Sequence, residues 1–218
     1  MGEHAETTEY LISQLDCVQF IGLEIAENLN EKGVRCVVLD MAPHVLPGFD
    51  TEMCEYAENH LSEQGIVCMT NTKLEAILGE DGKVSKVKTS KRAVKADLVV
   101  MSVGIRPNTA FLKDSGLEFA RNGAILVDDH MRTNDPDIYA AGDCVMVKNL
   151  ITGNDAYSPM GSSANIEGRL LAKNIAGADL SYRGVLGTAV CKLPELNTGR
   201  TGLSEAQAKD AGYDPISV

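Results

Sequence analysis

The chain has 218 residues and is 44% hydrophobic, which is enough to bury the core of one or two globular domains. Its formal net charge of -11 argues against nucleic acid or an anionic membrane surface as the main partner, and no apolar run approaches the ~20 residues of a membrane helix. The six cysteines form no CxxC pair, the histidines show no metal-ligand spacing and the first residues do not resemble a signal peptide, so we expect a cytoplasmic protein with reduced thiols and no metal.

One long helix is predicted near the N-terminus, over about residues 8–31. Their apolar residues recur at spacings of 4, 3, 3, 4 and 4, which is a helical period: Leu11, Leu15, Val18, Ile21, Ile25 and Leu29. Thr7 or Thr8 supplies an N-cap, with Glu9 in the first turn. The alternative is a strand, a turn and a shorter helix. The period favours a single helix from about Thr8 to Glu31.

The next part of the chain alternates strands with a helix and a hairpin. Short apolar runs predict buried parallel strands over residues 35–40, 66–69 and 96–103. An amphipathic helix is predicted over residues 50–64, with Gly65 as its C-cap and one apolar face made of Met53, Ala57 and Leu61. The Asp81-Gly82 pair predicts a hairpin between residues 73–78 and 83–89. This order of elements is typical of a dinucleotide-binding half.

The following segment is less regular. Strands are predicted over residues 125–127 and 138–141, and a helix over residues 162–176 that ends at Gly177. The pattern changes again at Asp179, where we place a boundary.

One acidic residue has the spacing of a ribose ligand. Asp40 ends the first predicted strand and lies 18 residues after Gly22, near the start of the preceding helix. A carboxylate at this spacing can accept hydrogen bonds from the adenosine ribose and repel a 2′-phosphate, which favours NADH over NADPH. The alternative is that Asp40 merely ends a strand.

Two further motifs support nucleotide binding. Gly104 follows an apolar strand, where a glycine lets the backbone approach a nucleotide. The run from Thr133 to Asp143 places Gly142-Asp143 at the end of a predicted strand, where Asp143 could accept a hydrogen bond from the ribityl chain of a flavin. A helix that begins near Gly161 would point its positive end at the flavin ring.

With these motifs the chain resembles the pyridine nucleotide-disulfide oxidoreductase family, in particular its coenzyme A-disulfide reductase and NADH oxidase branch. The matching stretches are Phe20–Glu27, Val38–Asp50, Asp97–Pro107, Asn122–Asp143 and Gly168–Gly177. The resemblance implies an α/β fold in three parts. These are an NAD-binding domain with a Rossmann-like parallel sheet and a hairpin insert (1–109), the C-terminal part of an FAD-binding domain (110–178) and the start of a dimerisation domain (179–218).

The resemblance also implies FAD and NADH as cofactors and a homodimer as the assembly. The residues that would line the NADH site are Gly22, Glu24, Asp40 and Gly104. Gly142 and Asp143 would hold the ribityl chain, and Ser163 and Ala164 would lie near the flavin ring.

The chain also departs from the family pattern. The glycine-rich FAD-binding segment and the redox cysteine that begin family members are not found. For Cys144, the role of a small buried filler is favoured over that of a redox thiol. The first two glycines of the NADH motif G-x-G-x-x-G fall at Cys17 and Gln19. Two functions therefore stay open: an FAD- and NADH-dependent oxidoreductase, or a remnant that acts as a folded or interaction domain without tightly bound cofactor.

Three expectations follow from the departures. The chain alone should carry no stoichiometric FAD, and it should bind NADH weakly. Apolar segments at residues 125–127 and 138–141, and beyond Asp179, should lack intramolecular cover and drive a homo-oligomer.

Overall fold

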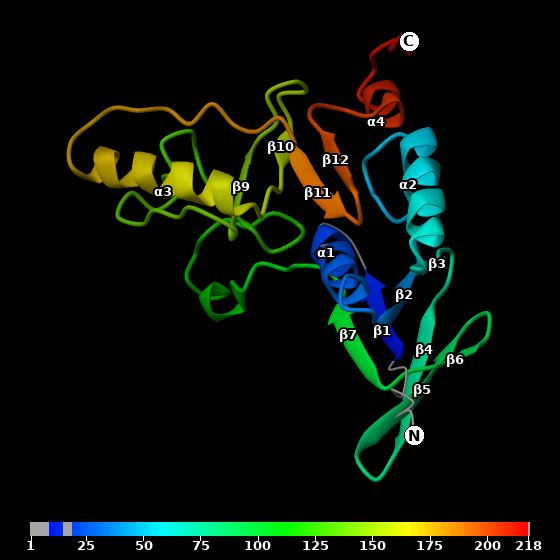
Figure 1. Ribbon diagram of the computed structural model, residues 1–218. Helices are drawn as coiled ribbons and strands as arrows, with labels where there is room; N and C mark the ends of the chain where they lie inside the picture. Colours follow the sequence, from blue (N-terminus) through cyan, green and yellow to red (C-terminus); the bar gives the residue numbers. More distant parts are fainter. Residues whose placement is uncertain (1–8, 15–18, 218) are drawn as a thin grey trace, which may run out of the picture. The chain divides into compact units, whose positions relative to one another are not determined.

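The computed structural model describes residues 9–14 and 19–217, which form two compact units (Figure 1). Unit 1 comprises Met1–Gly104 together with Ala189–Val218, and unit 2 comprises Ile105–Thr188. The sequence placed the corresponding divisions after residues 109 and 178. Among the described residues, no helix is long and apolar enough to cross a membrane.

A parallel four-stranded sheet forms the centre of unit 1. Its strands, in the order β3-β2-β1-β7, are Val67–Met69, Arg35–Asp40, Glu9–Gln14 and Leu98–Ser102. β2 packs Cys36 and Val38 against a cluster that contains helix residues, and Val37 and Leu39 against a second cluster. Because both faces are covered, the strand is apolar without strict alternation, as the sequence predicted.

The prediction of one helix over residues 8–31 is wrong. Glu9–Gln14 is strand β1, and the helix that follows, α1, spans only Gln19–Asn30. β1 is paired along its length with β2 on one side and with β7 on the other. These partners lie far along the chain, so their hydrogen bonds override a local helical period. Of the predicted stripe, Ile21 is 49% exposed, and residues 15–18 lie outside the described part of the chain.

Helix α2 (Thr51–Glu63) confirms the predicted amphipathic helix, but its buried face is shifted. Cys54, Ala57 and Leu61 are buried, whereas Met53 is 61% exposed. The spacing of 3 and 4 residues from Cys54 follows the helical period more closely than the spacing of 4 and 4 from Met53. Cys54, one of the six cysteines expected to be reduced, packs in the buried cluster as a small apolar residue.

A second, antiparallel sheet covers the other face of the parallel sheet in unit 1. It consists of β4 (Leu74–Glu80), β5 (Lys83–Thr89) and β6 (Ala93–Lys95). The predicted hairpin is confirmed at the β4–β5 turn, where Asp81 and Gly82 have φ values of 51° and 78°. Positive φ at both central residues is the requirement of a type I′ turn.

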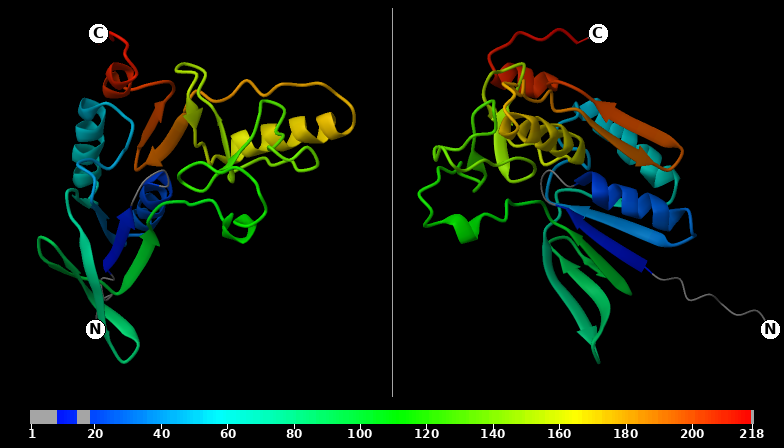
Figure 2. Two further views of the ribbon diagram at one scale, coloured as in Figure 1. Left: turned by 180° about the vertical axis from the view of Figure 1, so that it is seen from behind. Right: turned by 90° about the vertical axis from the view of Figure 1, so that its left-hand side faces the viewer.

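The C-terminal segment packs on unit 1. A hairpin of β11 (Ala189–Leu193) and β12 (Leu196–Arg200) lies against α1, and the short helix α4 (Glu205–Asp210) follows (Figures 1 and 2). Cys191 and Leu193 are fully buried in the same cluster as Leu23 of α1. Lys192 Nζ lies 2.5 Å from Oε1 of the fully buried Glu27. This hairpin therefore completes the core on the helical side of unit 1.

Unit 2 contains a small sheet and one long helix. The sheet, in the order β10-β9-β8, consists of Asp155–Ala156, Val145–Lys148 and Ile125–Leu126, with a short 3-10 turn, η1, at Ala110–Leu112. The helix α3 spans Gly161–Ile175, close to the predicted 162–176. Leu170 and Leu171 of α3 pack on a core that includes Ile125 and Val145.

The predicted strand over residues 138–141 is wrong. Residues 138–141 form no strand: Tyr139 makes one isolated bridge to Arg132, and Ala140 N donates to Met131 O. A local turn thus satisfies this backbone in place of a sheet. The expectation that the apolar faces of this region lack intramolecular cover is wrong only for part of them. Ile125 is 4% exposed and Ala140 8%, whereas Ile138 is 37% and Tyr139 36% exposed.

Candidate functional site

The residues predicted to line an NADH site gather at one edge of the unit 1 sheet. Parallel strands place their carboxyl ends at the same edge, where ligands of open α/β sheets bind. Asp40 ends β2, Gly104 follows β7 by two residues, and Gly22 and Glu24 lie in α1, which follows β1. Gly104 has a φ of 99°, which requires glycine at this position.

Asp40 stabilises the turn that leaves β2. Its side chain is fully buried, and its Oδ1 accepts a hydrogen bond of 2.8 Å from Ala42 N. Its carbonyl oxygen accepts one of 2.8 Å from Thr72 N. The aspartate therefore has a structural role that the sequence did not reveal, in addition to the ribose-binding role that its spacing predicts.

The two predicted NADH-site residues of α1 lie in the first half of the helix. Gly22 is buried in the first turns of the helix and Glu24 is half-buried, with its carbonyl oxygen accepting a hydrogen bond from Asn28 Nδ2 at 2.7 Å. Cys17 and the side chain of Gln19 lie outside the described part of the chain. Their effect on a dinucleotide phosphate therefore stays a prediction from sequence.

The predicted flavin residues are brought together in unit 2. Gly142 has a φ of 90°, and a Cβ built on it would lie 3.5 Å from Ala164 Cβ in the first turn of α3. Asp143 is exposed, while its carbonyl oxygen accepts a hydrogen bond of 2.9 Å from the hydroxyl of Tyr157. The Gly-Asp turn is therefore fixed at its backbone and presents its carboxylate to solvent.

The N-terminus of α3 is suited to an electron-rich ligand. Its N-cap residue, Met160, makes no side-chain capping bond, and its first turn holds no acidic residue. Ser163 lies in that turn. The first N–H groups of a helix have no intrahelical partner and carry partial positive charge. A flavin ring placed there would meet hydrogen-bond donors and a favourable dipole.

Two residues of this site were missed from the sequence. Glu167 on α3 is 2% exposed, and its Oε2 accepts a hydrogen bond of 2.7 Å from Gly142 N. The side chain of Tyr182 is hydrogen-bonded to Glu167 and to Ser163. Burial raises the pKa of both Glu167 and Tyr182. One sequence signal could have found Glu167. It lies one helical turn after Ser163, on the same face as Leu170 and Leu171, which pack in the core.

Cys144 follows the Gly-Asp turn and has the environment of a structural thiol. It is half-buried, its Sγ lies 3.6 Å from Ala141 O, and burial raises its pKa. A thiol with a raised pKa is a poor nucleophile. This environment agrees with the structural role expected from the sequence.

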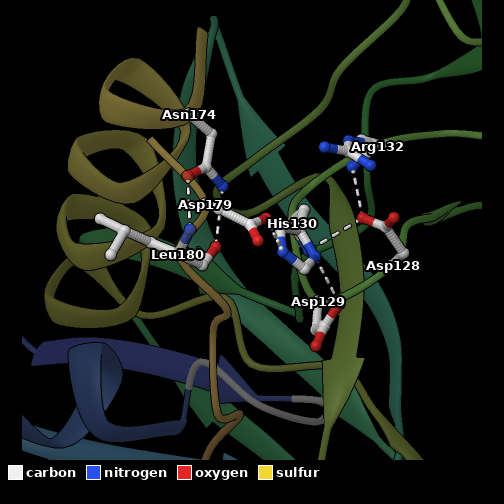
Figure 3. Close-up of polar contacts among 7 residues, drawn as sticks. All are labelled: Asp128, Asp129, His130, Arg132, Asn174, Asp179 and Leu180. Carbon is white, nitrogen blue, oxygen red and sulfur yellow. Dashed lines mark hydrogen bonds and ion pairs between the residues drawn. The ribbon is translucent and has the colours of Figure 1, made fainter. Parts of the chain in front are cut away.

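An ion-pair cluster joins the segment that leaves α3 to the loop that follows β8 (Figure 3). His130 Nδ1 lies 2.7 Å from Asp129, and its Nε2 lies 3.0 Å from Asp179 (Figure 3). Asn174 exchanges two side-chain hydrogen bonds with the backbone of Leu180, at 2.8 and 2.9 Å. Both ring nitrogens of His130 are used in these pairs, and we assign no metal to the cluster.

This cluster predicts a pH-dependent contribution to stability. The hydrogen bond to Asp129, with the charges of Asp129 and Asp179, raises the pKa of His130. The contribution is therefore fully present below the ordinary histidine pKa of about 6.5 and is lost as pH rises through the folded-state value. The melting temperature of the chain should exceed that of His130→Asn most at pH 5.5, and the difference should shrink steadily toward pH 9. A difference in melting temperature that does not change with pH would show that the charge of His130 does not contribute to stability.

Comparison with known proteins agrees with this arrangement. Residues 20–164 match the family described as pyridine nucleotide-disulphide oxidoreductase. The chain is 40% identical over 189 residues to the NADH oxidase of Methanocaldococcus jannaschii, covering 86% of this chain and 42% of that protein. It is 35% identical over 196 residues to the CoA-dependent NAD(P)H sulfur oxidoreductase of Pyrococcus furiosus, covering 89% of this chain and 44% of that protein.

A solved structure extends the likeness to the fold. The FAD-dependent pyridine nucleotide-disulphide oxidoreductase of Desulfovibrio vulgaris superposes with a TM-score of 0.89 at 38% identity, covering 97% of this chain and 53% of that one. The chain thus spans less than half the length of the curated relatives named above.

Proposed function

The chain belongs to the pyridine nucleotide-disulphide oxidoreductase family, and on this premise we propose that it provides the NADH-binding unit and part of the FAD-binding unit of a flavoprotein oxidoreductase. Unit 1 would bind NADH, and the Gly142–Asp143 turn with α3 would bind part of FAD. A bound flavin supplies two-electron chemistry: it accepts a hydride from the nicotinamide and passes the electrons to a disulfide, to oxygen or to another acceptor.

The observation that carries this proposal is the carboxyl edge of the unit 1 sheet. There a carboxylate ends β2, a glycine with positive φ follows β7, and α1 begins after β1. These are the positions at which a dinucleotide needs a ribose acceptor, close backbone approach and a helix N-terminus. In unit 2, the uncapped start of α3 beside Gly142 supports the placement of the flavin ring near Ser163 and Ala164.

The second candidate is a folded or interaction domain without tightly bound cofactor. Cys17 and Gln19, which replace two motif glycines, favour it. The expected lack of stoichiometric FAD and the expected homo-oligomer also stay predictions. For assembly, the support is a set of exposed apolar residues, among them Val190 at 66%, Ile175 at 65% and Ile138 at 37%, whereas Ile125 and Ala140 are covered within unit 2.

An Asp40→Asn variant distinguishes the two candidates. The carboxylate should repel a 2′-phosphate, so the unmodified chain should bind NADH at least about tenfold more tightly than NADPH, which corresponds to ~1.4 kcal/mol. Asparagine keeps an oxygen that can accept from Ala42 N–H but removes the charge. The substitution should therefore reduce the preference for NADH over NADPH without unfolding the turn that leaves β2. Binding is measured by nucleotide fluorescence or calorimetry.

The control is Glu55→Gln, an equal change of charge at an exposed position on α2. It should leave the NADH preference unchanged. If neither nucleotide binds in a saturable way, or if Asp40→Asn and Glu55→Gln behave alike, unit 1 is not an NADH-binding unit and the second candidate is correct.

A further inference from the structure

The buried face of α3 contains an ionisable residue where an apolar one is expected. Glu167 is 2% exposed, and it is the buried residue of this helix. Glutamate is almost never fully buried unless its carboxylate is paired or hydrogen-bonded. The side chain must therefore be held by specific partners.

Those partners are donors from two other segments of unit 2. Gly142 N donates to Oε2 at 2.7 Å, which is the length of a charge-assisted hydrogen bond. The Tyr182 side chain, from the segment that follows α3, is hydrogen-bonded to the same carboxyl group and to Ser163. The nearby charge is the Asp143 carboxylate, which is of like sign. Hydrogen bonds thus hold the Glu167 carboxylate, which among the described residues forms no ion pair.

The bond to Gly142 fixes the turn that presents Asp143. Gly142 has a φ of 90°, in the left-handed region that favours glycine. Its N–H is held by Glu167, and its carbonyl oxygen accepts a hydrogen bond of 3.1 Å from Val145 N. The carbonyl oxygen of Asp143 is held by Tyr157 at 2.9 Å. Asp143 therefore leaves a fixed backbone with its own side chain exposed, which is the arrangement of a preorganised ligand group.

We propose that Glu167 is a positioning residue for Asp143, oriented by the hydroxyl group of Tyr182 and acting through the Gly142 N–H group. This inference rests on the proposed function in one respect, namely that Asp143 would meet the ribityl chain of FAD. Glu167 itself touches no cofactor. Its role is to hold the Gly142–Asp143 turn in the conformation that presents the carboxylate.

The protonation of Glu167 gives this role a pH dependence. Burial, followed by the charge of Asp143, raises the pKa of Glu167, and the bond from Gly142 N–H opposes that rise. The ionisable groups that face it are Asp143, Tyr182 and Cys144. A neutral carboxyl group accepts a weaker hydrogen bond than a carboxylate. The hold on Gly142 should therefore loosen as pH falls through the raised pKa.

The test is amide hydrogen exchange and chemical shift at Gly142, followed by NMR in the full chain without flavin. Glu167→Ala should speed exchange at Gly142 by at least about tenfold, whereas Glu167→Gln, which keeps an acceptor oxygen, should restore most of the protection. The Gly142 amide shift should titrate in the unmodified chain and stay flat with pH in Glu167→Gln. Tyr182→Phe should give intermediate exchange. Ile166→Ala, at an exposed neighbouring position on α3, is the control and should leave Gly142 protected.

Two outcomes would overturn the inference: Gly142 exchange that is unchanged in both Glu167→Ala and Tyr182→Phe, or a Gly142 shift that titrates identically in Glu167→Gln. If Glu167→Ala does not fold, the Glu167→Gln titration and the Tyr182→Phe exchange decide alone. These readouts need no flavin. A separate failure of FAD to bind would count against the proposed function and leave the positioning result standing.

Discussion

Replacing Cys17 and Gln19 together by glycine should tighten NADH binding at least about tenfold, which corresponds to ~1.4 kcal/mol. The framework of the motif is in place, because β1 is paired within the sheet and α1 begins at Gln19 with Gly22 in its first turns. The first motif glycine allows the tight turn and the second allows the pyrophosphate to approach the backbone. Calorimetric titration of the two proteins with NADH measures the change.

The matched control is Cys17→Ala with Gln19→Ala. Alanine removes most of the side-chain bulk but keeps a Cβ and the restriction on positive φ. It should recover less affinity than glycine. If the glycine variant binds NADH no better than the unmodified chain, the loss of binding lies beyond these two positions, and the interpretation of Gly22 as the third motif glycine is wrong.

Leu193→Ala should lower the free energy of unfolding by about 2–5 kcal/mol, the usual cost of truncating a fully buried leucine. Leu193 lies in β11, yet it shares one buried cluster with Leu23 of α1 and Leu61 of α2. The change therefore opens a cavity in the core of unit 1, although the residue lies about 90 positions beyond the rest of that unit in sequence. Urea denaturation measures the loss.

Val190→Ala is the control for this substitution. Val190 lies on the opposite face of the same strand and is 66% exposed, so its truncation should change stability by only about 0.5 kcal/mol. Equal effects of the two substitutions would show that the hairpin does not pack on α1 in solution. In that case residues 189–218 would be separate from unit 1, as in the sequence-based division, which placed residues 179–218 in a dimerisation domain.

The elements that were predicted well are those whose local pattern and burial agree. Residues 36–39 of β2 are a continuous apolar run, because Val38 packs in the cluster with the helices and Val37 in the cluster with the antiparallel sheet. The turn at Asp81-Gly82 was predictable because few residue pairs accept positive φ twice in succession. In both cases, the determinant lies within a few residues of the element itself.

The wrong prediction for β1 and the site residues missed from the sequence depend on partners that lie far along the chain. β1 is a strand because β2 and β7 satisfy its backbone on both sides, and a helical period in its sequence carries no information about them. Likewise, the Glu167–Gly142 bond joins residues 25 positions apart, and Tyr182 reaches Glu167 from beyond the end of α3. When a side chain bonds to a distant backbone group, the sequence shows only a charged residue among the apolar positions of a helix.

The central claim is that the carboxyl edge of the unit 1 sheet binds NADH, and an NADH titration followed by amide NMR tests it most directly. We expect saturable shifts at the amides of Gly22, Asp40 and Gly104, with weak affinity, and smaller shifts at the same amides with NADPH. Saturable shifts confined to other residues, or no saturable shift at these three positions up to millimolar NADH, would contradict the account.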